Sequence, residues 1–310
     1  MNKPGFRITI AAILIFSCIS ISTVSGKSPV ESMFVTTQWL EEHLADPSLL
    51  LLHVGRKEGY DKEHIPGARI FSLLEVVVNS PNGLFHERPP IAKLDSVLKS
   101  AGVSDTSRIV VYYAESRGIS LATRLLLTLD YAGLGDSTSM LQGGFPRWKA
   151  ENRKLTAELP EALTGNYTPR PNADVFVDGK WINDNIRNPN IVIIDARPEE
   201  VYTGIERDSH SKRRGHIAGA FNIPFFELMT EDSPSQLKDA AELAEIFSDN
   251  GAKPGSVLVI YCGTGIWASP VYFAAKYLGY DVRFYDGSFQ EWTGDKTLPV
   301  IEPVKIRPYQ

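Results

Sequence analysis

The hydrophobic residues of this chain form short continuous runs, separated by longer stretches in which apolar residues recur with helical spacing. Runs of this kind are typical of strands buried on both faces, and they lie at residues 49–54, 109–113, 191–196 and 257–261. The stretches between them predict helices over residues 91–100, 122–130, 240–250 and 271–278. This alternation predicts an α/β fold in which a parallel sheet carries helices on both faces.

The same pattern occurs twice in the chain. The segment His-Ile-Pro-Gly-Ala at His64 matches His-Ile-Ala-Gly-Ala at His216, 152 residues further on. Tyr113, at the end of an apolar run, matches Cys262 at an offset of 149 residues. Residues 49–54 match 191–196 and residues 141–148 match 285–292 in the same way. Four matches in the same order indicate a duplicated domain. We therefore expect two tandem domains, residues 33–155 and 173–300, joined by a proline-containing linker over residues 156–172.

The N-terminal segment has the features of a secretory signal. Lys3 and Arg7 precede an apolar stretch over residues 8–21, and small residues follow up to Gly26. The apolar stretch is shorter than the roughly 20 residues that a membrane-spanning helix needs. We expect residues 1–26 to be a cleaved signal peptide and the mature protein to be periplasmic, without stable membrane insertion. An uncleaved membrane anchor is the alternative.

Composition agrees with a soluble two-domain protein. The chain has 310 residues, a formal net charge of −5 and 43% hydrophobic residues. It contains no strongly basic stripe, so a nucleic-acid partner is not expected.

Cys262 is the only cysteine that remains once the signal peptide is removed. It follows a buried strand and precedes a Gly-x-Gly turn and a helix. Free backbone N–H groups and the positive end of a helix dipole favour a thiolate in such a position, so we expect a nucleophile. The alternative is a buried, inert cysteine, which is the commoner role of a single thiol.

With these motifs in the same order and spacing, the chain resembles the tandem-domain rhodanese family of sulfurtransferases, which act on thiosulfate or 3-mercaptopyruvate. The resemblance covers roughly residues 33–300 and implies an inactive first domain and an active second one. The first copy has Tyr113 in place of the thiol, and a phenol with a pKa near 10 cannot replace a thiolate at neutral pH. The first domain is therefore expected to be structural and to close one wall of a cleft.

The resemblance also implies the chemistry. A persulfide forms on Cys262 when it attacks a small sulfur donor, and a small thiol, cyanide or a reduced thioredoxin-like protein then removes the sulfur. This reaction needs no metal or organic cofactor. Backbone N–H groups of the loop after the cysteine would hold the sulfur, and the loop comprises Gly263, Thr264, Gly265, Ile266, Trp267 and Ala268.

The neutral Cys-Gly-Thr-Gly sequence is similar to that of mercaptopyruvate-type members. In that subgroup the hydroxyl at Thr264 is expected to act with a first-domain histidine, which the resemblance places at His64, while Arg207 binds the substrate carboxylate. Two departures stand out. Trp267 replaces a small residue at the pocket mouth, and Val201 replaces an arginine of the carboxylate clamp. Lys212, Arg213 and Arg214 could compensate or could form a solvated turn.

Several residues have simpler interpretations. We expect Asp195 and Arg197 to form an ion pair, His216 to brace its turn, and Trp148 and Trp292 to pack in the core.

A phosphatase would need an arginine six positions after the cysteine, where Ala268 stands. The serious alternative to an enzyme is an exported, non-catalytic persulfide carrier.

Overall fold

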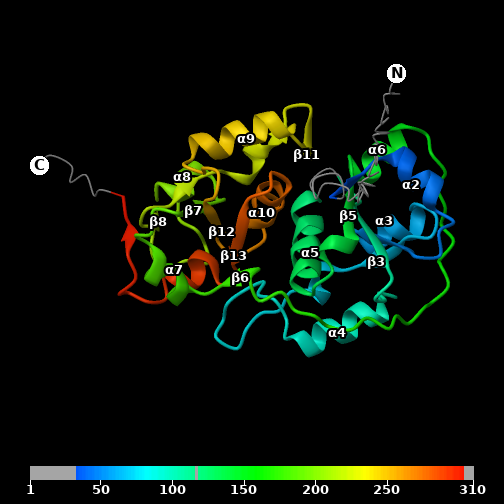
Figure 1. Cartoon of the computed structure of the whole chain (residues 1–310), viewed down its shortest axis with the longest axis horizontal. Coiled ribbons are helices and arrows are strands. Elements are labelled where there is room, and N and C mark those ends of the chain that lie inside the picture. Colours follow the sequence, from blue (N-terminus) through cyan, green and yellow to red (C-terminus); the bar gives the residue numbers. More distant parts are fainter. Residues whose placement is uncertain (1–32, 116–117, 304–310) are drawn as a thin grey trace, which may run out of the picture.

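The computed structural model describes residues 33–115 and 118–303, so the expected signal peptide lies outside the described residues. Two domains, each built on a five-stranded parallel sheet, lie side by side (Figure 1). The strand order is β1-β5-β4-β2-β3 in the first domain and β6-β13-β12-β7-β9 in the second, which is the same arrangement repeated. The predicted α/β fold with parallel sheets is confirmed.

The four predicted apolar runs form strands whose bounds differ from the prediction by at most one residue, and the remaining short strands were not predicted. The first sheet comprises β1 (Phe34–Val35), β2 (Leu49–Val54), β3 (Arg69–Phe71), β4 (Arg108–Tyr113) and β5 (Thr138–Leu141). The second comprises β6 (Phe176–Val177), β7 (Ile191–Asp195), β9 (Phe221–Asn222), β12 (Val257–Tyr261) and β13 (Asp281–Tyr285). Two antiparallel pairs accompany the second sheet: β10 (Met229–Thr230) with β11 (Ser233–Leu237), and β14 (Val300–Ile301) with β8 (His216–Ile217).

Helices cover the faces of both sheets. The first domain has α2 (Thr37–His43), α3 (Lys57–Lys62), α4 (Ile91–Ser100), α5 (Ile119–Tyr131), α6 (Gly144–Ala150) and the 3₁₀ turns η1 (Leu73–Glu75) and η2 (Gly135–Ser137). The second has α7 (Gly179–Asn185), α8 (Glu199–Tyr202), η3 (Phe225–Leu228), α9 (Ala240–Asp249), α10 (Ala268–Tyr277) and α11 (Ser288–Trp292). Helix α10 begins three residues before the predicted start, because Pro270 lies in the first turn, where a missing N–H costs little.

The two copies repeat one hydrogen-bonded brace. In the first domain the Tyr60 hydroxyl donates to the Ala68 carbonyl at 2.7 Å, and the Tyr60 ring stacks on His64 with centroids 4.0 Å apart. In the second domain Tyr202 donates to the Ala220 carbonyl at 2.7 Å and stacks on His216 at 3.8 Å. The His216 brace expected from the sequence is therefore present, and the first copy contains its equivalent.

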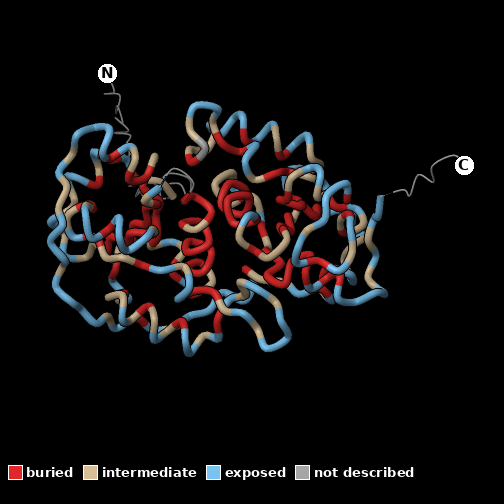
Figure 2. The backbone as a smooth tube through the Cα atoms, turned by 180° about the vertical axis from the view of Figure 1, so that it is seen from behind, coloured by how far each residue is buried: buried red, intermediate tan, exposed pale blue. Residues whose placement is uncertain are grey.

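A single hydrophobic core runs through both domains. Helix α5 is buried around nearly its whole circumference and packs on α10, and buried residues of both inner sheet faces join in this layer (Figure 2). Two smaller cores lie on the outer faces. As expected from the sequence, Trp148 and Trp292 are fully buried, one in each outer core.

The segment expected to link the domains lies along the first one. Gly165 N–H donates to the Lys99 carbonyl at 2.8 Å, and Tyr167 N–H donates to the Val103 carbonyl at 3.2 Å. The Tyr167 side chain is buried, with its hydroxyl on the Ala132 carbonyl. The segment is thus fixed to the first domain along its length. In the described part of the chain, no helix combines the length and apolar character needed to cross a bilayer.

Tyr113 connects the copy without a thiol to the other domain. Its side chain is 1% exposed, and its hydroxyl donates to the Ser235 carbonyl in the β10–β11 hairpin at 2.7 Å. Replacing Tyr113 by Phe leaves that carbonyl without its donor, and we expect the free energy of unfolding to fall by about 1–3 kcal/mol. Urea denaturation measures the change. Tyr280→Phe is the control, since the Tyr280 hydroxyl bonds no described residue, and equal losses in the two variants would contradict the assignment.

Candidate active site

A cavity of about 460 Å³ opens at the carboxyl end of β12, where residues from both domains meet. Parallel sheets commonly bind ligands at this edge, because loops from neighbouring strands converge there. The lining residues come mainly from the second domain, with one histidine from the first: His86, Arg197, Val201, Arg207, Asp208, Ser209, His210, Cys262, Gly263, Thr264, Ile266 and Trp267.

Cys262 directly follows β12 and is 2% exposed. Its Sγ accepts a hydrogen bond from the Gly265 N–H at 3.1 Å, so the loop curls back over its own cysteine. Gly265 has φ +86°, a left-handed conformation that glycine adopts without strain. The Gly-x-Gly turn read from the sequence therefore places a backbone donor on the thiol.

The electrostatic balance at Cys262 differs from the sequence expectation. Burial raises the pKa of the thiol above its ordinary value, and the nearby charge of Asp195 adds to this effect. Backbone N–H groups of Thr264, Ala268 and Gly265 lower the pKa without cancelling the effect of burial. The expectation that backbone N–H groups and the helix dipole make this position favour a thiolate is therefore wrong, because desolvation of the buried thiol outweighs the backbone hydrogen bonds.

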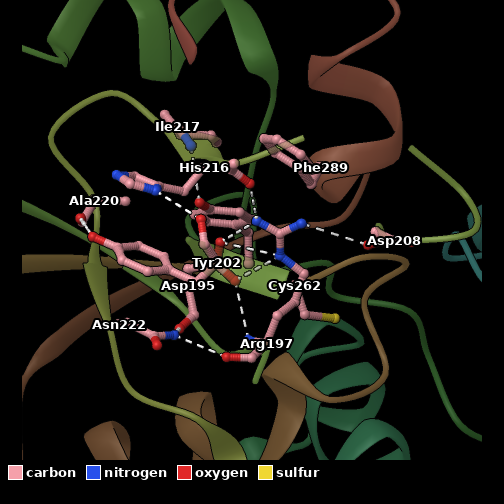
Figure 3. Close-up of polar contacts among 12 residues, drawn as sticks. Asp195, Arg197, Tyr202, Asp208, His216, Ile217, Ala220, Asn222, Cys262 and Phe289 are labelled. Atoms are coloured by element: carbon pink, nitrogen blue, oxygen red, sulfur yellow. Dashed lines mark hydrogen bonds and ion pairs between the residues drawn. The ribbon is translucent and has the colours of Figure 1, made fainter. Parts of the chain in front are cut away.

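Asp195 and Arg197 form the expected ion pair next to the cavity (Figure 3). The Arg197 Nε and Nη2 atoms lie 2.9 and 2.5 Å from Asp195 oxygens, and both side chains are almost completely buried. Arg197 also donates to the Gly215 carbonyl and lies 3.6 Å from Asp208. Arg197 lines the cavity, but the carboxylates of Asp195 and Asp208 compensate its charge. Its role is therefore to hold the segments of Asp208 and Gly215 against the end of β7.

His86 is the cavity residue that sequence reasoning missed. Its Nδ1 lies 3.1 Å from the Thr264 Oγ1, across the domain interface. Its backbone has φ +60°, an uncommon conformation for a residue with a Cβ and one that is often found at functional sites. Burial lowers the pKa of the imidazole below its ordinary value, and the positive charges of Arg124 and His210 lower it further. The ring is therefore mainly neutral at pH 7.

His64, the histidine expected to face Thr264, lies elsewhere, and that prediction is wrong. It is fully buried in the first domain, with Nδ1 2.7 Å from the Tyr60 carbonyl and Nε2 3.1 Å from the Glu158 carbonyl. Both ring nitrogens are thus engaged by backbone groups, and His64 does not line the cavity. The sequence match between His64 and His216 could have indicated this structural role, because the two histidines brace equivalent turns.

The other predicted binding residues lie in or next to the cavity. Arg207 lines it and forms no ion pair with a described residue, and Val201 lines it as well. Trp267 is 45% exposed at the mouth and stacks on Phe225 with ring centroids 5.6 Å apart. Ala268 is fully buried at the start of α10.

The basic turn over residues 212–214 cannot replace the missing arginine. Arg213 pairs with Glu302 at 2.8 Å, and Arg214 donates to the carbonyls of Gly204 and Ile205. None of the three basic side chains of this turn lines the cavity. Arg207 is therefore the unpaired cation available to an anionic ligand among the lining residues that the structure describes.

Backbone contacts fix the loop that carries His86 to the second domain. Phe85 N–H donates to the Gln290 side chain at 3.0 Å, and the Gln290 amide donates back to the Phe85 carbonyl at 2.9 Å. Arg88 N–H donates to Asp286 at 2.7 Å. The first domain therefore supplies a positioned residue to the cavity as well as closing one wall.

Comparison with known proteins shows the family of the chain. The Rhodanese-like domain model matches residues 36–151 and 178–295, and the chain belongs to this family. The 3-mercaptopyruvate sulfurtransferase of Escherichia coli strain K12 is 30% identical over 284 residues, covering 88% of this chain and 98% of that protein. The thiosulfate sulfurtransferase of Rattus norvegicus is 29% identical over 275 residues, covering 83% and 91%. The relatives are thus sulfurtransferases of both donor types.

Solved structures agree on the fold. SseA from Escherichia coli, a 3-mercaptopyruvate sulfotransferase, superposes with a TM-score of 0.72 at 28% identity, covering 83% of this chain and 98% of that one. The anaerobic ergothioneine biosynthesis enzyme from Chlorobium limicola superposes with a TM-score of 0.77 at 21% identity, covering 88% of this chain and 71% of that one. The latter likeness concerns the fold alone.

Proposed function

We propose that this protein transfers sulfur from 3-mercaptopyruvate, through a persulfide on Cys262, to a small thiol, cyanide or a thioredoxin-like protein. One observation carries the proposal. Two groups from different domains line the same cavity. The Cys262 thiol of the second domain accepts a backbone hydrogen bond, and the neutral His86 of the first domain bonds the Thr264 hydroxyl. The sulfurtransferases among the relatives support the reaction class.

The first half-reaction moves sulfur and one proton. The Cys262 sulfur forms a bond to the donor sulfur while the carbon–sulfur bond of mercaptopyruvate breaks, and the carbon leaves with the electron pair as the enolate of pyruvate. A proton then converts the enolate to pyruvate. In the second half-reaction, an acceptor such as cyanide takes the outer sulfur as thiocyanate, and the Cys262 thiolate is regenerated.

His86 is suited to handle the proton. Because burial raises the pKa of the Cys262 thiol, the resting sulfur is protonated at pH 7 and needs a base. A neutral imidazole can accept this proton. Thr264 belongs to the cysteine loop, and its Oγ1 lies 3.1 Å from His86 Nδ1, so its hydroxyl can pass the proton from Cys262 to His86. The same pair can return the proton to the enolate carbon.

The donor follows from the few charges in the cavity. The loop over residues 263–268 has no cationic side chain, which disfavours the two negative charges of thiosulfate. Arg207 can pair with the single carboxylate of mercaptopyruvate, while Val201 offers only apolar surface. We therefore propose mercaptopyruvate as the better donor, bound with a high Michaelis constant, and thiosulfate as a weaker one.

Cys262 should carry the transferred sulfur. Incubation with mercaptopyruvate should add about 32 Da, the mass of one sulfur atom, to the peptide that contains Cys262, and Cys262→Ser should lose turnover because a serine hydroxyl forms no stable persulfide. Peptide mass spectrometry and pyruvate release measure the two effects. A wild-type protein that forms thiocyanate only once per chain would be a carrier, and near-normal turnover in Cys262→Ser would exclude the nucleophile.

The two histidines should behave differently. His86→Asn should lower kcat by roughly 10- to 1000-fold, as expected for loss of a proton-handling group. His64→Asn should lower thermal stability and leave kcat of the folded protein within about threefold, since His64 binds only backbone carbonyls. In the wild type, activity should fall as the pH decreases through the lowered pKa of His86, because the imidazolium cannot accept a proton. An acid limb unchanged between wild type and His86→Asn would contradict this role.

Val201 should control affinity for the carboxylate. Val201→Arg places a second cation beside the cavity, and a bidentate contact worth about 1.5–3 kcal/mol should lower the Michaelis constant for mercaptopyruvate by one to two decades. Steady-state kinetics with both donors measures the change, and Val201→Leu is the neutral control. Wild-type activity on thiosulfate ten times higher than on mercaptopyruvate would overturn the choice of donor.

A further inference from the structure

Arg124 is a fully buried arginine at the domain interface, on α5 of the first domain. One guanidinium nitrogen, Nη2, donates to Asp286 of the second domain at 2.7 Å and to the His86 carbonyl at 2.9 Å. The other, Nη1, lies 3.2 Å from the Gly265 carbonyl. One side chain of the first domain therefore touches the backbones on which both halves of the candidate site are built.

The cost of burying this charge calls for an explanation. A guanidinium loses its hydration when it enters a protein interior, and only a close counter-ion and complete hydrogen bonding offset that loss. Asp286 provides the counter-ion, but the buried Nε of Arg124 has no partner among the described residues. An apolar residue would fill this place in the α5–α10 layer at a lower cost in free energy. Stability alone therefore does not explain why an arginine stands here.

We propose that Arg124 is a positioning residue that holds the His86 loop and the Cys262 loop in register across the domain interface. The proposal rests on the proposed sulfur transfer, in which these two loops act together. The domain without a nucleophile thereby contributes to the chemistry of the other domain.

Gly265 shows how the contact acts on the cysteine. Its N–H donates to Cys262 Sγ at 3.1 Å, and its carbonyl accepts from Arg124. A single residue is thus held at one end by the thiol and at the other by the guanidinium. A Cβ at this position would lie 3.1 Å from Arg124 Nη1, which is further evidence of the tight fit.

His86 is held in the same way. Its left-handed backbone is an unfavourable conformation that persists only when neighbouring contacts impose it. Phe85 and Arg88 are bound through their backbones to Gln290 and Asp286, and Arg124 binds the carbonyl of His86 itself. The Asp286 carboxylate accepts from both Arg124 and the Arg88 N–H, so it joins the helix to the loop.

The charge of Arg124 also acts on the imidazole. Arg124 on α5 and His210 on the facing loop both lower the pKa of His86, while Asp286 partly compensates Arg124. Arg207, Asp208 and Thr264 line the same cavity. Removing the Arg124 cation should therefore raise the pKa of His86. If Arg124 served only to pack the interface, its removal would leave this pKa unchanged.

The test compares Arg124→Met and Arg124→Lys with Arg153→Met. Arg153 is a first-domain arginine paired with Glu151 and Glu41 outside the cavity, so it serves as the matched control. We expect Arg124→Met to lower kcat on mercaptopyruvate by about 10- to 100-fold, the usual effect of misplaced reacting groups, with the Michaelis constant changed by less than about threefold. Its acid limb should shift to higher pH. Arg124→Lys should keep the limb and recover part of kcat, and it remains informative if Arg124→Met does not fold.

Two further measurements need no sulfur donor. Nitrogen-15 NMR titration of the His86 ring should give a higher pKa in Arg124→Met than in wild type, and the rate of Cys262 alkylation by iodoacetamide should change with it. If the wild type transfers no sulfur but these shifts occur, the proposed function fails and the positioning role stands. If the His86 titration, Cys262 alkylation and kcat of folded Arg124→Met all match those of Arg153→Met, the positioning role is overturned.

Discussion

The close packing of α5 on α10 is the constraint on which the rest of this structure depends. These helices are buried between the two sheets and merge the inner cores of both domains into one. Because the contact is closely packed and also contains the bonds of Tyr272 and Lys276 to Asp130, the relative position of the domains is fixed at the level of side chains. The loop of His86 and the loop of Cys262 can therefore form one cavity although they belong to different copies of the fold.

The duplication preserved the scaffold and changed the ends of the strands. Both copies keep the stacked tyrosine and histidine brace, and both bury a tryptophan in the outer core. At the end of the central strand, however, one copy has Tyr113 and the other Cys262. Parallel sheets allow this divergence, because the residues that set the fold lie within strands and helices, while chemistry depends on the loops that follow them.

Apolar runs and helical spacing were enough to predict four strands, four helices and the position of Cys262, since each depends on local patterns that the sequence shows directly. The remaining strands and helices are mostly too short for a period to stand out. The histidine that bonds Thr264 could not be predicted in this way. The family resemblance placed the partner of Thr264 at His64, whereas the match of His64 with His216 in the repeat indicated a brace. His86 lies in a loop without periodicity, and only the packing of the domains brings it to Thr264. The raised pKa of the thiol likewise depends on burial, which a linear pattern does not reveal.

The hydrogen bond from Tyr113 to Ser235 has a consequence for whether the two domains could exist separately. Each copy sends a segment over the strand ends of the other: the loop of His86 in one direction and the β10–β11 hairpin in the other. Deleting the first domain would therefore remove both a wall of the cavity and His86 from the second domain. The two domains are thus joined by contacts in both directions, and neither can be cut away without opening the surface of the other.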